Sequence, residues 1–351
     1  MKDNYKKIAL WQTAFLGDSV LTLPLIKALS LRFPEAEIHL FVRKGVEPLF
    51  AAQKELAGVY GFDKRGAQKS MKAAFKYGAE IAKQDYDLWI SAHTSMRSAV
   101  VSMASKIPDR IGYTAPWYNR LVYTKTVNRK FTELEEVERL LALGKPLGIS
   151  ESTPQVELNI PSDILAESKS FFSQFSGRPV IGIHPGSTWQ TKKWPENNFA
   201  QIISKCVKAG YKVLLFGGPD EMDLCNVILQ QAEHKTDVTN IAGKLNLQQL
   251  AAYIRQLNLY LTNDSGPMHI AWIQNVPLVA MFGPTVKKFG FFPRGKNSTI
   301  LESSENLSCR PCGLHGGKSC PEKHHKCMTN ITVEMVWEEI IEKVEKQKVI
   351  L

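Results

Sequence analysis

Short strand-like segments alternate with amphipathic segments along nearly the whole chain, and this alternation restricts the fold more than any other feature. In the first half, the strand-like segments are residues 8–11, 37–42, 87–90 and 110–113. Between them, residues 17–29 and 97–105 have helical periodicity. Strands that alternate with helices predict an α/β protein with parallel sheets.

A second series of the same kind begins after residue 178. Its strand-like segments are residues 180–183, 211–216, 259–262 and 276–281, and an amphipathic helix follows at 333–348. The most weakly patterned stretch of the chain, residues 133–178, separates the two series. We therefore predict two doubly wound, Rossmann-like domains, residues 1–170 and 171–351. In such folds the ligand binds in a central cleft, at the carboxyl ends of the strands.

The composition is that of an ordinary globular protein, with 44% hydrophobic and 22% charged residues among 351. It excludes a disordered, collagen-like or coiled-coil chain. The net charge of +10 favours a polyanionic partner such as nucleic acid, a nucleotide, a phosphorylated lipid or an anionic membrane. Basic residues are densest at 64–83, a segment that is either a solvated helix face or a basic amphipathic helix lying on a membrane.

The sequence contains no apolar stretch as long as a membrane span, which needs about 18–20 residues, and its N-terminal apolar run is too short for a signal peptide. Six cysteines are too few for a disulfide scaffold. Both features predict a cytoplasmic protein. Two of the cysteines, Cys206 and Cys225, lie in helical patterns and are expected in the core.

The other four cysteines cluster near the C-terminus, with three histidines among them. Their spacing is C-x2-C-x7-C-x6-C, formed by Cys309, Cys312, Cys320 and Cys327. A CxxC pair with two further thiols suits a structural zinc ion or an iron–sulfur cluster. Because the second pair is not a CxxC, a reduced or redox-labile loop is the alternative.

Polar residues follow the predicted strands, where folds of this kind carry their chemistry. After the first strand, Gly17 permits a tight turn and Asp18 stands at a helix start. Asp18 is either a helix cap or a carboxylate directed into the cleft as a general base. The motifs of a dinucleotide dehydrogenase, GxGxxG, and of a P-loop NTPase, GxxxxGK[ST], are absent.

Loops of the second half have the composition of a phosphate site. Ser187 and Thr188 precede a helix, and Lys192 adds a positive charge, so this loop is either an anion site or an ordinary polar loop. Two glycines precede Glu221, which is either placed to bind ribose hydroxyls or is a helix-start carboxylate in a turn.

A second loop with the composition of a phosphate site follows residue 262. Asp264, Ser265 and Gly266 stand at a helix N-terminus, where N–H groups and the helix dipole attract anions. Two such loops in one half predict a diphosphate ligand. His269, a little further along, is either a core histidine or part of this site.

The segment Asp85-Tyr86-Asp87 has the form of the DxD metal motif of some glycosyltransferases. It precedes a predicted strand, whereas the metal-binding residues of that motif follow one. We therefore interpret it as polar residues at the start of a strand.

These loops together resemble the bacterial ADP-heptose–lipopolysaccharide heptosyltransferases. The stretches that carry the resemblance are Gly17–Pro24, Ile181–Ser187, Lys192–Pro195, Gly217–Glu221, Ala242–Lys244 and Asn263–His269. Their order and spacing cover nearly the whole chain. The tail, with Cys309-Arg310-Pro311-Cys312 and His324–Met328, most resembles the type II members.

The resemblance implies a GT-B fold whose first domain binds the acceptor and whose second binds the nucleotide sugar. It implies inverting transfer of heptose from ADP-heptose to the inner core of a lipid A-linked oligosaccharide, with no required metal. Asp18 would be the base, and Lys192 would stabilise the departing diphosphate. Donor-binding residues would be Ser187, Thr188, Glu221, Lys244, Leu245, Asp264, Ser265, Gly266 and His269.

The acceptor half is matched mainly through Gly17–Pro24 and Ser95–Ser98, so Ser95 and Arg97 are the acceptor-binding hypotheses. Many family members carry a histidine before the stretch that is Glu135–Arg139 here, and this chain lacks it. A phosphorylated lipid acceptor suits the basic charge and predicts peripheral contact with the anionic inner membrane from the cytoplasmic side.

Two alternatives to a heptosyltransferase stay open. One is a glycosyltransferase of the same fold with another nucleotide-sugar donor, because residues 284–330 could reshape the sugar pocket. The other is a basic protein with a Cys-rich metal module that binds nucleic acid or a membrane. That class predicts aromatic residues among the basic ones, yet none occurs between Cys309 and Cys327, so no nucleic-acid partner is expected.

Overall fold

The computed structural model describes residues 2, 4–150, 152–175 and 177–348. The chain forms two compact units, Met1–Asn159 and Ile160–Leu351. The expected boundary, between residues 170 and 171, would cut helix α8 (Ser162–Ser173). That helix packs against α11 (Leu247–Arg255), so it groups with the second unit.

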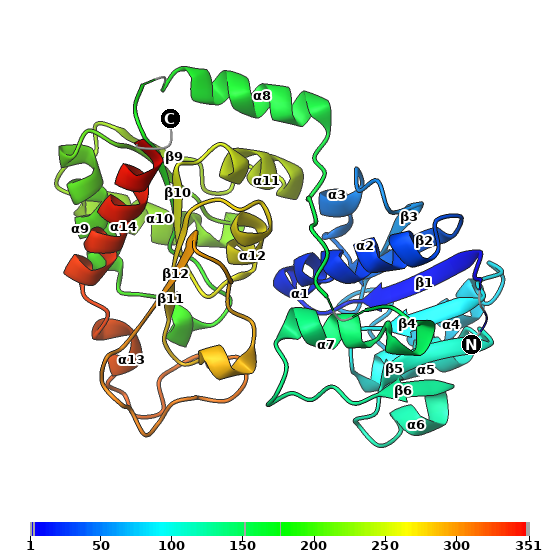
Figure 1. The fold of residues 1–351 in the computed structure, drawn as a ribbon. Coiled ribbons are helices and arrows are strands. Elements are labelled where there is room, and N and C mark those ends of the chain that lie inside the picture. Colours follow the sequence, from blue (N-terminus) through cyan, green and yellow to red (C-terminus); the bar gives the residue numbers. More distant parts are fainter. Residues whose placement is uncertain (1, 3, 151, 176, 349–351) are drawn as a thin grey trace. The chain divides into compact units, whose positions relative to one another are not determined.

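A six-stranded parallel sheet forms the centre of the first unit, in the order β3-β2-β1-β4-β5-β6 (Figure 1). Its strands are β1 (Lys7–Gln12), β2 (Glu37–Arg43), β3 (Gly58–Phe62), β4 (Leu88–Ser91), β5 (Asp109–Tyr113) and β6 (Lys125–Val127). Its helices are α1 (Leu16–Leu21), α2 (Leu23–Arg32), α3 (Glu47–Phe50), α4 (Met71–Ile81), α5 (Met96–Ala104), α6 (Asn119–Val122), α7 (Glu136–Ala142) and η1 (Lys145–Leu147). In register, Ile8 pairs with Ile38 on one side and Leu88 on the other.

Large aromatic side chains fill the core between this sheet and helices α4 and α5. Trp11 and Trp89 stack with ring centroids 5.2 Å apart, and Phe41 and Phe62 pack beside Trp11. Central strands of a parallel sheet are buried on both faces, which explains their nearly continuous apolar sequences. At the start of β4, Asp87 accepts hydrogen bonds from the backbone of Lys6 (2.9 Å) and Lys7 (3.2 Å), which confirms that this carboxylate serves the strand start.

Two helix predictions in this unit are corrected. The helix expected over 17–29 is divided at Thr22, because Pro24 lacks an N–H group and stands in the first turn of a new helix, α2. The basic helix expected over 64–83 is confined to α4, and Lys64, Arg65 and Lys69 precede it outside any helix.

The second unit contains another six-stranded parallel sheet, in the order β12-β11-β10-β7-β8-β9 (Figure 1). Its strands are β7 (Val180–His184), β8 (Lys212–Leu215), β9 (Val238–Asn240), β10 (Leu259–Asn263), β11 (Leu278–Phe282) and β12 (Ser298–Glu302). Besides α8 and α11, its helices are η2 (Gln190–Lys192), α9 (Glu196–Lys208), η3 (Pro219–Glu221), α10 (Met222–Gln231), α12 (Gly266–Ile273), η4 (Lys287–Phe289), α13 (Lys326–Thr329) and α14 (Val333–Lys348).

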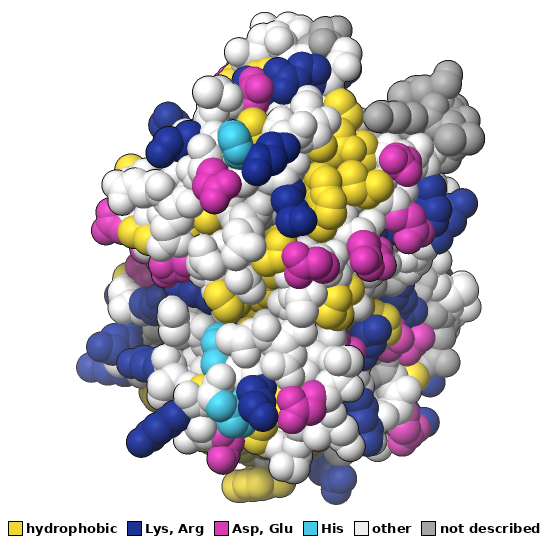
Figure 2. Space-filling view, turned by 90° about the vertical axis from the view of Figure 1, so that its left-hand side faces the viewer, with side chains coloured by type: hydrophobic (Ala, Val, Ile, Leu, Met, Phe, Trp, Pro, Cys, Tyr) yellow, Lys and Arg dark blue, Asp and Glu magenta, His cyan; other side chains and the backbone are white. Residues whose placement is uncertain are grey.

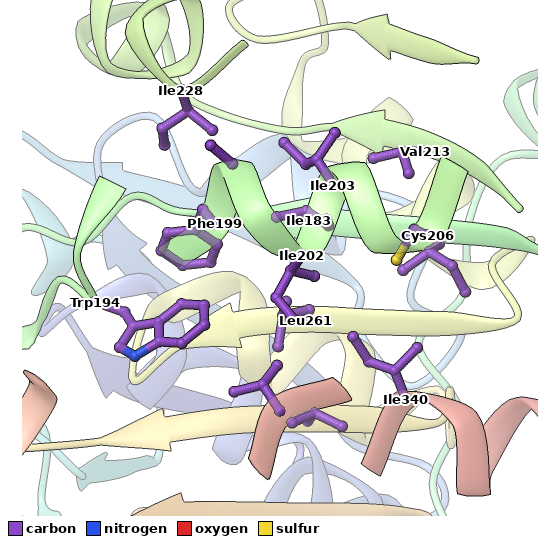
Figure 3. Packing of buried hydrophobic residues seen from close by; sticks show 14 of the residues in the cluster. Ile183, Trp194, Phe199, Ile202, Ile203, Cys206, Val213, Ile228, Leu261 and Ile340 are labelled. Carbon is purple, nitrogen blue, oxygen red and sulfur yellow. The ribbon is translucent and has the colours of Figure 1, made fainter. Parts of the chain in front are cut away.

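Helices α9, α10 and α14 cover one face of this sheet through a single apolar cluster. Figure 3 shows Phe199, Ile202 and Ile203 of α9 packed among Ile183, Leu261 and the α14 residue Ile340. Cys206 and Cys225 are fully buried in this cluster, as predicted. Among the described residues, no helix is long and apolar enough to cross a bilayer.

Candidate active site

Asp18 lies in the first turn of α1, immediately after strand β1. Its Oδ2 accepts a hydrogen bond from the backbone N–H of Phe15 (3.1 Å), so the carboxylate does cap its helix. The residue is half-buried. The capping bond occupies one oxygen, and the catalytic role of Asp18 stays a prediction.

A buried ion-pair network lies beside Asp18. Glu136, the first residue of α7, accepts hydrogen bonds from Arg129 (2.8 Å to each carboxylate oxygen) and from Arg139 (2.8 Å). Burial and the negative charge of Glu136 raise the pKa of Asp18 to about 6, against the opposing effect of Arg129. Asp18 therefore has the proton affinity that suits a general base near neutral pH.

Three basic side chains surround His93, which follows strand β4. Burial and the positive charges of Lys64, Arg129 and Arg97 lower the pKa of His93 to about 3, so this ring is neutral. Its Nδ1 lies 3.0 Å from the Thr13 hydroxyl. Among the described residues, the buried Nε atoms of Arg97 and Arg129 have no hydrogen-bond partner. Such donors beside a lysine form a site able to receive an anion.

The predicted acceptor residues, Ser95 and Arg97, lie in the same region, but their hydrogen bonds differ. Ser95 is the N-cap of α5, and its hydroxyl accepts a hydrogen bond from Ser98 N (3.1 Å). Arg97 donates to the carbonyl of Lys64 (3.2 Å), which ties the loop after β3 to α5. The local structure therefore accounts for Ser95 as a cap, whereas the guanidinium of Arg97 retains an unpaired donor.

In the second unit, the predicted donor residues gather at the carboxyl edge of the sheet. They follow four strands that are neighbours in the order β10-β7-β8-β9. Ser187 and Thr188 follow β7, Glu221 follows β8, Lys244 and Leu245 follow β9, and Asp264, Ser265 and Gly266 follow β10. Buried Asn263 links two of these loops by donating to the Pro185 carbonyl (2.7 Å).

Lys192 and Asp264 form a close ion pair, with Lys192 Nζ 2.5 Å from Asp264 Oδ2. Thr285 donates a hydrogen bond to the same oxygen (2.7 Å). The lysine side chain is only 11% exposed and the aspartate 10%. The pairing holds the ammonium group next to the N-terminal end of α12, where a diphosphate would meet both positive charge and free N–H groups.

The N-terminus of α12 is not capped by its own side chain. Ser265 makes no capping bond, and its hydroxyl lies 3.1 Å from the hydroxyl of Thr262. His269, on the first turns of α12, is 5% exposed, and its Nδ1 has no partner among the described residues. Burial and the charge of Lys192 lower the pKa of His269 to about 4, against the effect of Asp264. His269 is thus a neutral ring beside the Lys192–Asp264 pair.

Glu221 is held by two hydrogen bonds to the same carboxylate oxygen. His184 Nε2 lies 3.0 Å from Oε2, and the backbone N–H of Gly218 donates to it at 2.8 Å. Burial opposes ionisation, but these bonds and the charge of His184 lower the pKa of Glu221 to about 2. The carboxylate is therefore ionised and fixed in η3, in the loop after β8, as a hydrogen-bond acceptor for hydroxyl groups.

The Cys-rich segment supports the loop that carries Lys192. Gly317 and Thr191 exchange three hydrogen bonds of 2.8–3.1 Å, and His325 Nε2 lies 2.7 Å from the Thr191 carbonyl oxygen. All six cysteines are free thiols. Cys309 Sγ lies 4.0 Å from His324 Nε2. Within residues 2, 4–150, 152–175 and 177–348, no three His, Cys, Asp or Glu side chains converge as metal ligands, and the metal site stays a prediction.

Comparison with known proteins agrees with the architecture. A family model described as glycosyltransferase family 9 (heptosyltransferase) matches residues 74–324, and so includes parts of both units. The chain belongs to glycosyltransferase family 9. Lipopolysaccharide heptosyltransferase 2 of Escherichia coli K12 is 27% identical over 347 residues, 95% of this chain and 97% of that protein.

Solved structures place this family 9 glycosyltransferase in the same fold. The E. coli ADP-heptose lps heptosyltransferase II structure superposes with a TM-score of 0.81 at 25% identity, covering 97% of this chain and 99% of that one. A family 9 glycosyl transferase from Veillonella parvula has a TM-score of 0.86 at 24% identity, covering 99% of each chain. The α/β, two-domain GT-B fold and the heptosyltransferase family are confirmed.

Several residues of the candidate site were not singled out from the sequence. Thr285 and His184 hold Asp264 and Glu221, and Arg129 and His93 surround the region of Asp18 in the first unit. His184 lies at the end of an apolar strand, which was a signal available in the sequence. Arg129 carried no such signal, because it lies in an irregular stretch between β6 and α7.

Proposed function

We propose that this chain transfers L-glycero-D-manno-heptose from ADP-heptose to the inner core of lipopolysaccharide, with inversion at the anomeric carbon. The observation that carries the proposal is the convergence of Lys192, Asp264, Glu221 and the α12 N-terminus at one sheet edge. This set of groups suits a nucleoside diphosphate: positive charge for phosphate and an ionised carboxylate for ribose. The similarity to lipopolysaccharide heptosyltransferase 2 supports a heptose as the sugar and lipopolysaccharide as the acceptor.

The proposed mechanism assigns each end of the displacement to one group of residues. Asp18 accepts the proton of the acceptor hydroxyl, whose oxygen then bonds to the anomeric carbon. The bond from that carbon to the ADP oxygen breaks, and the electron pair leaves with ADP. Lys192 and the N–H groups at the loops with Ser187, Thr188, Ser265 and Gly266 stabilise the charge that develops there. A lysine and a helix dipole replace the divalent metal that other glycosyltransferases use.

The remaining donor contacts follow from the positions of the loops. Glu221 binds the ribose hydroxyls, and Lys244 and Leu245, in the turn after β9, line the adenine site. Asp264 and His269 contact the heptose or the phosphates. Lys192 is already oriented by its pair with Asp264 before any ligand binds, so little side-chain entropy is lost on binding.

On the acceptor side, the basic group around His93 supports an anionic acceptor. Lys64, Arg97 and Arg129 would bind a carboxylate or phosphate of the lipid A-linked oligosaccharide, with Ser95 nearby. A nucleic-acid partner is not proposed. On the face drawn in Figure 2, basic side chains are interspersed with acidic ones, whereas nucleic-acid binding favours a continuous basic patch.

Calorimetric titration of the purified protein with ADP, UDP and GDP tests the donor assignment. We expect ADP to bind at least tenfold more tightly than UDP or GDP, with no change on adding EDTA, because the proposed phosphate contacts need no metal. Turnover of ADP-heptose with a truncated lipid A-linked acceptor would follow. A preference for UDP or GDP would favour the alternative donor, and a loss of ADP binding with EDTA would contradict metal-independent binding.

A structural zinc ion or iron–sulfur cluster at Cys309, Cys312, Cys320 and Cys327 is a separate proposal. Its support is the donor set itself, four thiols in one segment with His324 close to Cys309. When bound, the metal would hold the segment that supports Thr191. Elemental analysis of the same preparation should find about one zinc ion, or the iron of one cluster, per chain. A fully active preparation without metal would contradict this proposal and favour the alternative, a reduced loop.

Helix α4 supports the proposed contact with the cytoplasmic surface of the inner membrane. It exposes Met71 (42%) and Phe75 (51%) one turn apart, beside the exposed Lys72 and Lys76. Each lysine near an anionic bilayer contributes about 1 kcal/mol, so Lys72→Glu and Phe75→Glu should each weaken vesicle binding several-fold.

Sedimentation with phosphatidylglycerol vesicles measures this binding, with phosphatidylcholine vesicles as the neutral comparison. Leu31→Glu is the matched control, since Leu31 is an exposed apolar residue (65%) of another helix in the same unit. The α4 contact would be refuted if Leu31→Glu weakened binding as much as Phe75→Glu.

A further inference from the structure

His184 is a buried histidine at the carboxyl end of β7, next to the loop that begins the proposed phosphate site. Its side chain is 7% exposed and that of Glu221 is 18% exposed. His184 ends β7, and Glu221 lies in η3, in the loop that follows the neighbouring strand β8. The side chain of His184 therefore bonds to a residue of the loop after β8, not to one of the loop after β7.

The hydrogen bond between the two residues has a defined direction. An ionised carboxylate can only accept, so Nε2 of His184 carries the proton that it donates to Glu221 Oε2. The Gly218 N–H donates to the same oxygen. Among the described residues, no hydrogen bond ends on the other oxygen, Oε1, and this atom lies over Gly186: a Cβ built there would be 1.9 Å from it. Glu221 thus presents one free oxygen beside the β7 loop.

The opposite edge of the imidazole ring faces the second phosphate loop. His184 Nδ1 lies 3.5 Å from the hydroxyl of Thr262, which is fully buried. That hydroxyl in turn lies 3.1 Å from Ser265 at the start of α12. The ring also lies parallel to Tyr260, with centroids 6.4 Å apart. Packing on one side and polar contacts on both edges leave the ring of His184 a single orientation.

We propose that His184 is a positioning residue that fixes the Glu221 carboxylate for the ribose hydroxyls of the donor, and thereby sets the preference for a ribonucleotide. This inference rests on the proposed function, because it takes Glu221 to bind ribose. Without the His184 donor, the carboxylate keeps only the Gly218 bond and turns away from its present orientation. The ribose contact is then lost while the diphosphate contacts, made by other loops, persist.

The test compares the affinities of ADP and 2′-deoxy-ADP, measured by calorimetry in the full-length chain. A hydrogen bond to a charged group contributes about 1.5–3 kcal/mol, so the wild type should prefer ADP by at least about tenfold. In His184→Met the two affinities should differ by less than twofold, so that the ratio of ADP affinity to 2′-deoxy-ADP affinity is close to one. In His184→Gln, whose amide N–H reaches the same place, the ratio should stay near the wild-type value. Affinity for inorganic pyrophosphate should change less than twofold in both variants.

His39→Met is the matched control, because His39 is also a buried histidine bonded to a neighbouring side chain, the Tyr86 hydroxyl of the first unit. It should keep the wild-type ratio. If His184→Met does not fold, His184→Asn takes its place in the test. The shorter amide of asparagine cannot reach Oε2 of Glu221, so the preference for ADP over 2′-deoxy-ADP should be lost equally.

The outcomes separate the two claims. A wild type that binds both nucleotides equally would overturn the ribose role of Glu221, and with it this part of the proposed function. A wild type that discriminates, together with a His184→Met variant of unchanged ratio, would overturn the role of His184 alone. Loss of pyrophosphate binding in His184→Met would assign the residue to the integrity of the whole site and would also overturn the positioning role.

Discussion

Asp18→Asn is expected to lower kcat for heptosyl transfer about 10³-fold while ADP affinity changes no more than a few-fold. General-base catalysis contributes about 10²–10⁴-fold, and an amide cannot accept the acceptor proton. ADP affinity persists because the proposed nucleotide contacts belong to the second unit. Steady-state kinetics with ADP-heptose and calorimetry with ADP measure the two quantities on one preparation.

The control for Asp18 must reproduce its structural role. Glu47→Gln does so, because Glu47 also lies in the first turn of a helix and accepts a backbone N–H bond, from Gly45. It should leave transfer within twofold of the wild type. If Asp18→Asn loses ADP affinity and transfer together, Asp18 is a structural residue and the base lies elsewhere.

The pH dependence of kcat/KM tests the same role of Asp18 as the general base. Burial and Glu136 raise the pKa of Asp18 to about 6, so the deprotonated, base-competent form is present above pH 6 and is lost below it. The acid limb of kcat/KM should therefore fall about tenfold per pH unit below about 6. Glu136→Gln removes the neighbouring negative charge and should move this limb to lower pH.

Lys192→Ala is the second substitution with a large expected effect. Removing one electrostatic donor of this kind costs about 2–4 kcal/mol of transition-state stabilisation, or roughly 30- to 1000-fold in kcat. Lys208→Ala, which removes a lysine 58% exposed and paired with Glu233, is the control and should change kcat less than twofold. A rate for Lys192→Ala close to that of the wild type would remove the residue from the mechanism.

The pairing of Lys192 with Asp264 offers a sharper version of this experiment. If the lysine only neutralises Asp264, the double variant Lys192→Ala/Asp264→Asn should regain most of the lost rate, because no unpaired charge remains. If Lys192 stabilises the leaving diphosphate, the double variant stays as slow as Lys192→Ala. We expect the second result.

The strands recognised from the sequence are the central ones of both sheets. β1, β2, β4 and β5, like β7, β8, β10 and β11, have apolar runs because both faces of each are covered. The strands that sequence patterns did not reveal are β3, β6, β9 and β12, and each is an outermost strand of its sheet. Apart from the buried Phe62, their residues are partly or fully exposed, so these strands lack the continuous buried apolar run of the central strands.

The same distinction applies to the site. Local sequence placed Asp18, Lys192, Glu221 and Asp264 after strands, because the step from an apolar run to a polar loop lies within a few residues. The sequence did not indicate which of these residues pair with one another. Lys192 and Asp264 are 72 positions apart, and His184 and Glu221 are 37 apart. These pairs form because β7 lies between β10 and β8, an order that periodicity does not encode.

By itself, the sequence determined the α/β class, the central strands and the loops that carry chemistry, since burial on two faces and turn geometry leave local signatures. The tertiary structure alone decided which of those loops meet and which side chains pair. It also decided the proton affinities of Asp18, Glu221 and His93, because a pKa depends on burial and on charges brought close from distant parts of the chain.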